Sequence, residues 1–375
     1  MKYFFILGRQ TELSIAEIEA KLRQQRTSFK TLQKKLDFAI IETEQELLVE
    51  ELINKLGGTI KIGLVVDEVP NVLATNLVKL IPDSDKKVHF GFSLHGFQTN
   101  LTKLGLETKK LLQEKDLKVR FVSSKENPLS SVIVQKNHLL DQGAELVLMK
   151  TEKNYIIGRT LAVQPFELLS KLDYGRPARD SYSGMLPPKL AQIMINLSET
   201  APKKLIYDPF CGSGTILQQG LILDYNVLGS DISPKAIHDT NENLDWLANE
   251  ISLKTKYSVF QSDVTKQGPL GLAISAIVTE PYLGPALRGH EKQEQVEKNI
   301  QSLMRLYRTA LQKFAEWLDP KGIVIMIVPK FQFNDQVISI DLNKLLPPRL
   351  KAVAKWEYAR EGQHVIREIY KLQKA

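Results

Sequence analysis

The stretch that decides the fold is Asp208-Pro209-Phe210-Cys211-Gly212-Ser213-Gly214-Thr215. It follows a short apolar run at 205–207 that predicts a strand, and it opens a helical pattern over 215–223. Gly212 and Gly214 allow a tight turn and let a ligand approach the backbone without a Cβ in the way. Since the following helix also begins with free N–H groups, this order predicts a ligand-binding turn.

The chain around this turn alternates between strands and helices. Further strands are predicted at 226–230, 257–260, 273–278 and 323–328, and further helices at 234–248 and 294–318. The last helix has one apolar face, made of Ile300, Leu303, Met304, Tyr307, Leu311, Phe314 and Leu318. The alternation predicts an α/β fold with a mostly parallel, doubly wound sheet. Two terminal segments, 353–358 and 365–372, have no helix between them and predict an antiparallel hairpin, which makes seven strands.

Acidic residues follow three consecutive predicted strands. They are Asp208, Asp231 and Asp263, and ligands of open α/β sheets bind at such strand ends. Asp231 could accept hydrogen bonds from the ribose hydroxyls of an adenosine-containing cofactor, and Asp263 could accept from an adenine amino group. The predicted cofactor-binding set is completed by Phe210, Gly212, Gly214, Thr215, Ile232 and Val264.

A dinucleotide-binding dehydrogenase is the natural competitor for such a turn. The third glycine of that motif is replaced by Leu217, and Asp208 would repel a pyrophosphate. A ligand that carries an ammonium and a sulfonium group, and no phosphate, suits an acidic turn better. S-adenosylmethionine is such a ligand, and it is the cofactor we expect.

The N-terminal half predicts two smaller α+β units. In residues 1–57 strands are expected at 3–7 and 38–41, a helix with Ser14 as N-cap and Glu17 as capping-box partner, and a second helix at 44–56. In residues 58–165 strands are expected at 60–66, 88–94, 119–122, 132–135, 145–150 and 155–160, and helices at 72–80 and 102–115. A linker, 166–188, leads into the C-terminal domain, 189–375, whose first helix starts at Pro188.

Charge is unevenly distributed along the chain. Residues 1–57 carry 9 basic and 9 acidic side chains, residues 58–165 carry 15 and 11, and the remainder carries 26 and 23. The net +4 of the second segment is concentrated on and after its second helix, which suits phosphate contact. The RNA-binding residues that we predict there are Lys109, Lys110, Arg120 and Lys125. A solvated helix face would give the same pattern.

The composition argues against several classes of protein. Cys211 is the single cysteine, so an internal disulfide is excluded and a reducing, cytoplasmic location is expected. The six histidines show no metal-ligand spacing, so we predict no metal site. The opening apolar run, residues 3–7, is too short to cross a bilayer and lacks a cleavage site, so we expect no signal peptide.

The fourth strand of the predicted parallel sheet ends in Thr279-Glu280-Pro281-Tyr282. Together with 208–215, this turn resembles the amino-methyltransferases, which place an Asp/Asn/Ser-Pro-Pro-Tyr/Phe motif there. Similarity to one group extends over nearly the whole chain, in the stretches 6–9, 12–14, 56–59, 119–122, 129–132, 184–191 and 367–369. These resemble the THUMP-domain tRNA guanine-N2-methyltransferases, of the archaeal and Trm11-like type.

The resemblance implies a ferredoxin-like domain at 1–57, a THUMP RNA-binding domain at 58–165 that holds the tRNA acceptor end, and a Rossmann-like methyltransferase domain at 189–375. It implies methylation of the exocyclic N2 of a guanine in tRNA, at position 10. A small activator subunit and the oligomeric state are left open.

The motif departs from the family pattern at two positions. Thr279 stands where the acidic residue is usual, and Glu280 stands at the first proline. We expect Glu280 to supply the carboxylate that localises the lone pair of the amine, with Thr279 assisting, and Tyr282 after Pro281 to stack on a flipped base. The alternatives are an rRNA or DNA amino-methyltransferase, or an RNA-binding protein whose catalytic site has decayed.

Overall fold

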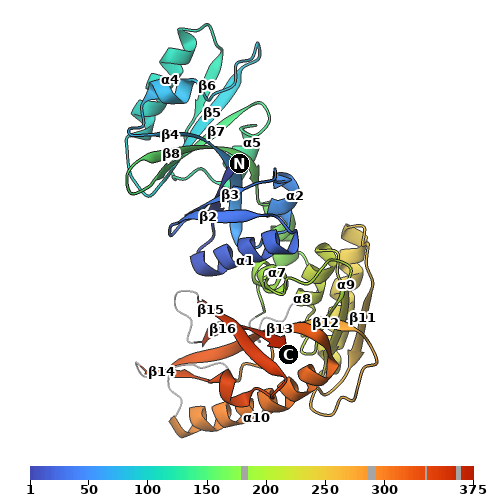
Figure 1. The fold of residues 1–375 in the computed structure, drawn as a ribbon. Helices are drawn as coiled ribbons and strands as arrows, with labels where there is room; N and C mark the ends of the chain where they lie inside the picture. The colour runs from blue at the N-terminus through green and yellow to red at the C-terminus, as the bar shows by residue number, and fades with distance from the viewer. Residues whose placement is uncertain (179–184, 286–292, 334–335, 360–364) are drawn as a thin grey trace. The chain divides into compact units, whose positions relative to one another are not determined.

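The computed structural model describes residues 1–178, 185–285, 293–333, 336–359 and 365–375. The chain divides into two compact units, one of residues 1–15 and 26–168, the other of residues 16–25 and 169–375. Each unit is built on its own eight-stranded sheet (Figure 1). The expected fold class, α/β with α+β elements before it, is confirmed.

The first unit has the strand order β2-β3-β1-β4-β8-β7-β5-β6. Its strands are β1 (Lys2–Leu7), β2 (Phe29–Lys34), β3 (Phe38–Thr43), β4 (Thr59–Val69), β5 (Val88–His95), β6 (Val119–Val122), β7 (Gly143–Lys150) and β8 (Tyr155–Val163). Its helices are α2 (Val49–Asn54), α3 (Ala74–Val78), α4 (Leu101–Gln113) and α5 (Ser131–Lys136), with the start of α1 (Thr11–Gln24).

The first six elements of this unit, β1-α1-β2-β3-α2-β4, follow the ferredoxin-like order. Their strands are adjacent, in the order β2-β3-β1-β4, and β1 pairs antiparallel with both β3 and β4. β4 starts at Thr59 and continues by pairing with β8, so the predicted boundary at residue 57 falls inside one continuous sheet.

Several predictions for local structure in the N-terminal half were wrong. The helix α1 begins at Thr11, so Ser14 lies inside it and donates its hydroxyl to the carbonyl of Gln10 instead of capping it. The strand β2 was missed, and the helix predicted at 44–56 is only the six residues of α2. Residues 132–135, predicted as a strand, belong to α5, whose N-cap is Ser130. A short β-branched run fits either structure, and here the capping side chain favours the helix.

The predicted linker also contains regular structure. Helix α6 (Phe166–Tyr174) occupies its first part, with Leu172 buried. Residues 179–184, which belong to the same predicted linker, lie outside the described ranges.

A buried polar network ties the centre of the first sheet to a neighbouring loop. The Lys61 ammonium on β4 contacts the Glu145 carboxylate on β7 and donates to the Leu129 carbonyl at 2.7 Å. Glu145 also accepts from Ser93 at 2.5 Å and from Thr160 at 2.6 Å. Lys61 and Glu145 are 2% and 0% exposed, so each charge depends on the other for its compensation.

Replacing Glu145 with alanine should therefore destabilise the first unit by about 3–5 kcal/mol, because it leaves a buried ammonium without its counter-charge. Hydrogen exchange of the β7 amides measures this locally, without assuming that the two units unfold together. Glu51→Gln removes the exposed pair with Lys55 (3.9 Å) and is the control that should leave protection unchanged. An equal reduction of protection in both variants would contradict the account of the network.

The second unit has the strand order β11-β10-β9-β12-β13-β16-β15, with β14 paired to β13. Its strands are β9 (Leu205–Asp208), β10 (Asn226–Asp231), β11 (Tyr257–Gln261), β12 (Ile274–Thr279), β13 (Leu318–Phe333), β14 (Gln336–Ser339), β15 (Leu350–Tyr358) and β16 (Val365–Lys374). All five parallel strands and the terminal hairpin were predicted. The strand β14 was not, so the sheet has eight strands in a mixed arrangement instead of seven.

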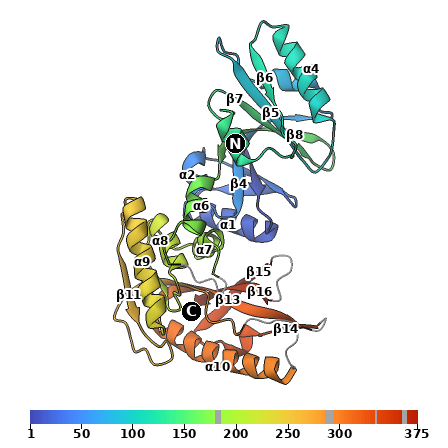
Figure 2. The ribbon, with the colours of Figure 1, turned by 180° about the vertical axis from the view of Figure 1, so that it is seen from behind.

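Helices cover both faces of this sheet. The helix α10 (Gln293–Trp317) packs its apolar face on one side, where Tyr307, Leu311 and Phe314 are fully buried. The helices α7 (Pro188–Leu197), α8 (Thr215–Ile222) and α9 (Pro234–Glu250) lie on the other side, as Figure 2 shows from behind. The one-sided pattern predicted for the α10 segment is confirmed, with Met304 at its partly buried margin. Leu318, predicted as the last residue of that helix, instead begins β13.

The order of the strands places the expected ligand-binding position at the centre of the sheet. From β9 the chain moves outward through β10 and β11, and it then returns to the other side of β9 to form β12 and β13. The carboxyl ends of β9 and β12 therefore meet where the winding reverses, the place at which open α/β sheets bind ligands.

Candidate active site

The glycine turn after β9 is held by one backbone hydrogen bond to β10 and one within the turn. The Cys211 N–H donates to the Ser230 carbonyl at 2.9 Å, and the Gly214 N–H donates to the Cys211 carbonyl at 2.8 Å. Gly212 and Gly214 have φ of +52° and +83°, in the left-handed region. A Cβ on Gly212 would meet no atom within 4 Å, whereas one on Gly214 would lie 2.9 Å from Thr240. The backbone of the turn is therefore open to a ligand at Gly212, whereas at Gly214 it packs against Thr240.

Asp208 is a buried acid at the tip of β9. Its Oδ1 accepts from the Thr279 hydroxyl at 2.7 Å and from the Phe210 N–H at 3.1 Å. Burial is the main reason that the pKa of Asp208 is raised from 3.8 to about 7, and the charges of Asp231 and Glu280 add to the rise. The site therefore holds a carboxylate that a nearby cation would stabilise.

Asp231 lies at the tip of β10 and faces the same turn. Its Oδ2 accepts from the Gly212 N–H at 3.1 Å, and its Oδ1 accepts from the Ser233 N–H at 2.9 Å. Beside it, Ile232 is 64% exposed, so its side chain is accessible to a ligand. The structure thus brings Asp208, Asp231 and the glycine turn together.

Asp263 is placed differently from the other two acids. Its Oδ1 accepts from both the N–H and the hydroxyl of Thr265, at 2.9 and 2.7 Å, and Lys266 lies 3.4 Å from its Oδ2. These contacts hold the pKa of Asp263 below its usual value, with the Thr265 hydroxyl as the largest cause. Val264 is buried in the core. The roles predicted for these two residues in cofactor binding remain predictions.

Phe210 and Thr215 lie in the turn itself. Phe210 is partly buried against the core that includes α10, and Thr215 is buried at the start of α8. The Thr215 hydroxyl accepts from Nη1 of Arg176 at 2.7 Å, a contact across 39 residues that sequence reasoning did not find.

Burial raises the pKa of the Cys211 thiol, so this cysteine is not an activated nucleophile.

The turn that follows β12 is attached to three different elements. Thr279 is fully buried and donates to Asp208 on β9. Glu280 Oε1 accepts from Nε of Arg367 on β16 at 2.6 Å, and burial raises the pKa of this glutamate while Arg367 opposes the rise. The Tyr282 carbonyl accepts from the hydroxyl of Tyr307 on α10 at 2.7 Å.

The side chains of this turn differ in their access to solvent. Tyr282 is 58% exposed, and the ion-paired side chains of Glu280 and Arg367 are 15% and 10% exposed. Pro281 and Thr279 are buried. Tyr282 is therefore accessible to a flat substrate, Glu280 is accessible only at its edge, and the buried Thr279 contacts Asp208.

The predicted RNA-binding residues lie on three different elements of the first unit. Lys110 is exposed and Lys109 half-buried on α4, and Lys125 is exposed in the loop after β6. Phe121 on β6 packs against Gly105 of α4, so the neighbouring Arg120 points from the opposite face of the strand. The α4 lysines and Arg120 thus face different sides of the sheet.

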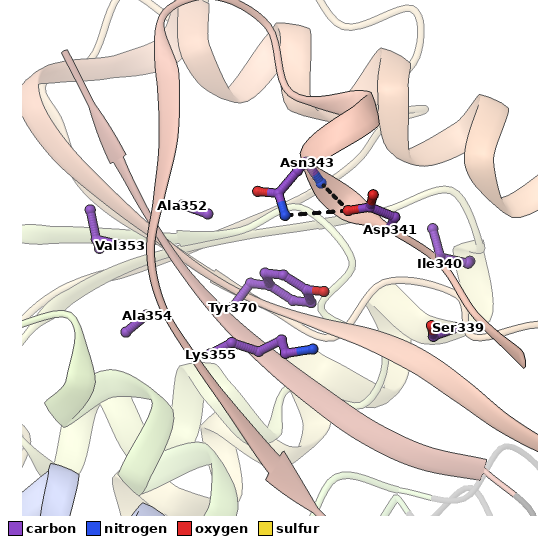
Figure 3. Close-up of a pocket in the computed structure, with 9 residues that line it drawn as sticks. All are labelled: Ser339, Ile340, Asp341, Asn343, Ala352, Val353, Ala354, Lys355 and Tyr370. Carbon is purple, nitrogen blue, oxygen red and sulfur yellow. Dashed lines mark hydrogen bonds between the residues drawn. The ribbon is translucent and has the colours of Figure 1, made fainter. Parts of the chain in front are cut away.

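A hollow of about 490 Å³ lies elsewhere in the second unit. Figure 3 shows Tyr370 and Lys355 side by side within it, with Asn343 hydrogen-bonded to Asp341. None of the predicted site residues is among the residues that line it.

Within the described residues, no cluster of three or more His, Cys, Asp or Glu could hold a metal ion, and no helix has the length and apolarity to span a bilayer.

Comparison with known proteins shows similarity to methyltransferases. Residues 176–339 match a family described as "RMKL-like, methyltransferase domain", and residues 84–242 match one described as "DNA methylase". The tRNA (guanine(10)-N2)-dimethyltransferase of Methanothermobacter thermautotrophicus is 31% identical over 198 residues, which are 52% of this chain and 51% of that protein. Its counterpart in Methanocaldococcus jannaschii is 27% identical over 157 residues, 40% and 43% of the two chains.

By these matches, about half of the chain is similar to tRNA guanine-N2-dimethyltransferases, and residues 176–339 are similar to a methyltransferase domain. The matches span about half the length of these curated relatives. The crystal structure of TrmN from Thermus thermophilus aligns over 100% of both chains with a TM-score of 0.58 at 15% identity. That likeness supports the α/β methyltransferase fold.

Asp208 should make the protein more stable at acid than at neutral pH. Its folded pKa of about 7 exceeds its ordinary 3.8, so its ionisation opposes folding increasingly from pH 4 to pH 7. Asp208→Asn keeps the acceptor for Thr279 and removes the buried charge. We expect it to raise the free energy of unfolding of the second unit by about 2–4 kcal/mol at pH 8 and by little at pH 4.

Calorimetric melting at the two pH values measures this effect. Asp263→Asn is the control with the opposite sign, because its carboxylate is stabilised in the folded protein and its removal should reduce stability at pH 8. A melting temperature of Asp208→Asn below that of the wild type at pH 8 would contradict the view that ionised Asp208 destabilises the fold.

Proposed function

We propose that this chain methylates the exocyclic N2 of a guanine in tRNA, at position 10, with S-adenosylmethionine as the methyl donor. The observation that carries this is the turn Thr279-Glu280-Pro281-Tyr282, held at the tip of β12 beside the glycine turn of β9. Two relatives of this chain are named tRNA (guanine(10)-N2)-dimethyltransferase, which supports the substrate.

The residues at the strand tips fit an adenosyl sulfonium ligand. Open space lies in front of the Gly212 backbone, and the exposed Ile232 adjoins the ribose-binding candidate Asp231. Asp208, with further carboxylates near it, would be stabilised by the ammonium group of the methionine part. Asp208 and the turn would hold that part, while Asp231 and Ile232 would hold the adenosine. When bound, S-adenosylmethionine supplies an electrophilic methyl group.

The chemical difficulty is the guanine amine, whose lone pair is delocalised into the ring. As the N–C bond forms from that lone pair, the electrons of the C–S bond stay on sulfur and the amine must lose one proton. The Glu280 carboxylate accepts a hydrogen bond from the amine, which localises the lone pair, and then takes the proton. Such a preorganised acceptor acts on the transition state and contributes about 2.7–4 kcal/mol.

Tyr282 provides the surface for the base. Its ring is exposed, and its backbone is fixed by Tyr307 and by the preceding Pro281. A guanine flipped out of its helix can stack on this ring with its amine directed towards Glu280. Alignment of the two reacting groups would then supply much of the rate.

The first unit is proposed to grip the RNA. Its residues 58–165 carry the excess of positive charge, and its exposed cations Lys110, Arg120 and Lys125 suit phosphate contacts on more than one side. We assign this segment to a THUMP domain and residues 1–57 with β4 to a ferredoxin-like module. A cytoplasmic location follows from a tRNA substrate and a single reduced cysteine.

Amino-methylation of DNA is the second candidate, because residues 84–242 match a DNA methylase family. The two candidates share the cofactor and the turn, and they differ in the polynucleotide that the protein binds.

Transfer of labelled methyl groups to tRNA, rRNA and duplex DNA tests the proposal directly. We expect incorporation into tRNA, with N2-methylguanine as the product by nucleoside mass spectrometry. Glu280→Gln should lower kcat by about 10²–10³-fold, since it removes the negative charge that stabilises the transition state and the carboxylate that takes the proton. Glu357→Gln is the matched control, a glutamate also ion-paired at 2.6 Å, and it should leave kcat unchanged. Label in DNA alone, or unchanged kcat in Glu280→Gln, would refute the assignment.

The α4 lysines should set the salt dependence of tRNA binding. Lys109→Ala with Lys110→Ala should weaken binding and reduce the slope of log K against log salt by about 1 for each phosphate that the protein no longer neutralises. Lys153→Ala, an exposed lysine in the β7–β8 turn, is the control that should leave the slope unaltered. An identical slope in the double variant and the wild type would remove α4 from the RNA interface.

A further inference from the structure

We propose that Arg367 is a positioning residue, whose ion pair keeps the Glu280 carboxylate ionised and directed at the substrate amine. This inference rests on the proposed function and assigns a role in it to a residue 87 positions away from the motif. Neither the motif nor its spacing indicates such a partner, since it lies on the antiparallel strand β16.

The fold brings the pair together across two strand pairings. Glu280 follows β12, which runs parallel to β13, and Arg367 stands opposite Pro329 of β13 in the antiparallel pairing of β16. Nε of Arg367 is 2.6 Å from Oε1 of Glu280. The ion pair is made to Oε1, so the proposal assigns Oε2 to the amine.

The burial of the pair distinguishes it from the surface ion pairs of the same sheet. The side chains of Arg367 and Glu280 are 10% and 15% exposed, whereas those of Lys330 and Glu357 are 22% and 48% exposed. A carboxylate so far removed from water needs a fixed opposite charge to remain ionised. Arginine suits this role because it stays protonated at any pH the protein meets.

Two other titratable groups, Asp208 and Tyr307, lie close enough to Glu280 for its charge to raise their pKa values. Asp208 on β9 is a neighbouring carboxyl group, and Tyr307 on α10 has its pKa raised in part by the charge of Glu280. Burial raises the pKa of Glu280 itself, and Arg367 is the group that lowers it. Glutamate at this motif position can therefore act as an acceptor only together with the arginine on β16.

The pH dependence of kcat at saturating S-adenosylmethionine and tRNA tests this role. In Arg367→Gln the acidic limb of the profile should move to higher pH by about 1 unit or more, because removal of an adjacent positive charge raises a carboxyl pKa by about 1–3 units. Arg367→Lys keeps the charge and should keep the limb at its wild-type position. Saturation with the methyl donor separates this limb from the titration of Asp208 in the free enzyme.

A double-mutant cycle then shows whether Arg367 acts through Glu280. If it does, Arg367→Gln has no further effect on kcat in a Glu280→Gln background, although it lowers kcat in the wild type. The double variant lacks both buried charges, so it remains testable even where Arg367→Gln alone does not fold. An unmoved acidic limb, or the same fold-reduction in both backgrounds, would overturn the proposal.

A direct titration makes the inference independent of activity. Glutamate labelled with ¹³C at the carboxyl carbon, with Glu280→Gln to identify the signal, reports the ionisation of Glu280 in the cofactor-free protein. We expect its midpoint to rise in Arg367→Gln and to stay near wild type in Arg367→Lys. A protein without methyl transfer to any nucleic acid would refute the proposed function, whereas an unchanged midpoint refutes the role of Arg367 alone.

Discussion

Three hydrogen bonds from three separate elements fix the turn at residues 279–282, and the function we propose depends on them. Asp208 on β9 receives the Thr279 hydroxyl, Arg367 on β16 binds Glu280, and Tyr307 on α10 binds the Tyr282 carbonyl. Because these elements meet only when the whole second sheet is assembled, the turn gains its shape from the fold and not from its own sequence. This is preorganisation of the kind that lets a polar group act on a transition state.

The electrostatics of the site independently favour a cationic ligand such as S-adenosylmethionine. Burial raises the pKa of Asp208, and the nearby charges of Asp231 and Glu280 raise it further. Burial also raises the pKa of Glu280, and Arg367 offsets part of that rise. Such an acidic site, facing open space at Gly212, favours a cation and disfavours a pyrophosphate. The strain of burying Asp208 reduces stability, as is common where a binding site requires charge.

The sequence predicted the second unit far better than the first. In the second unit, short apolar runs alternate with helical patterns, and α10 has one apolar face. These patterns were enough to predict every parallel strand and α10. In the first unit, α2 and α5 have six residues each, too few for a helical period to show. The acids and glycines of the site were recognised from their places at strand ends. Arg367, Tyr307 and Arg176 were not, because their contacts cross 87, 25 and 39 residues and depend on tertiary pairing.

We propose that the glycine turn of β9 and the turn after β12 together form one pocket for an adenosyl ligand and its acceptor. A crystal structure of the protein with S-adenosylhomocysteine would show this. We expect the ribose hydroxyls on Asp231, the amino group near Asp208, and the sulfur facing Glu280 and Tyr282. Adenosine bound away from the tips of β9 and β10, or a sulfur directed away from the turn at residues 279–282, would contradict it.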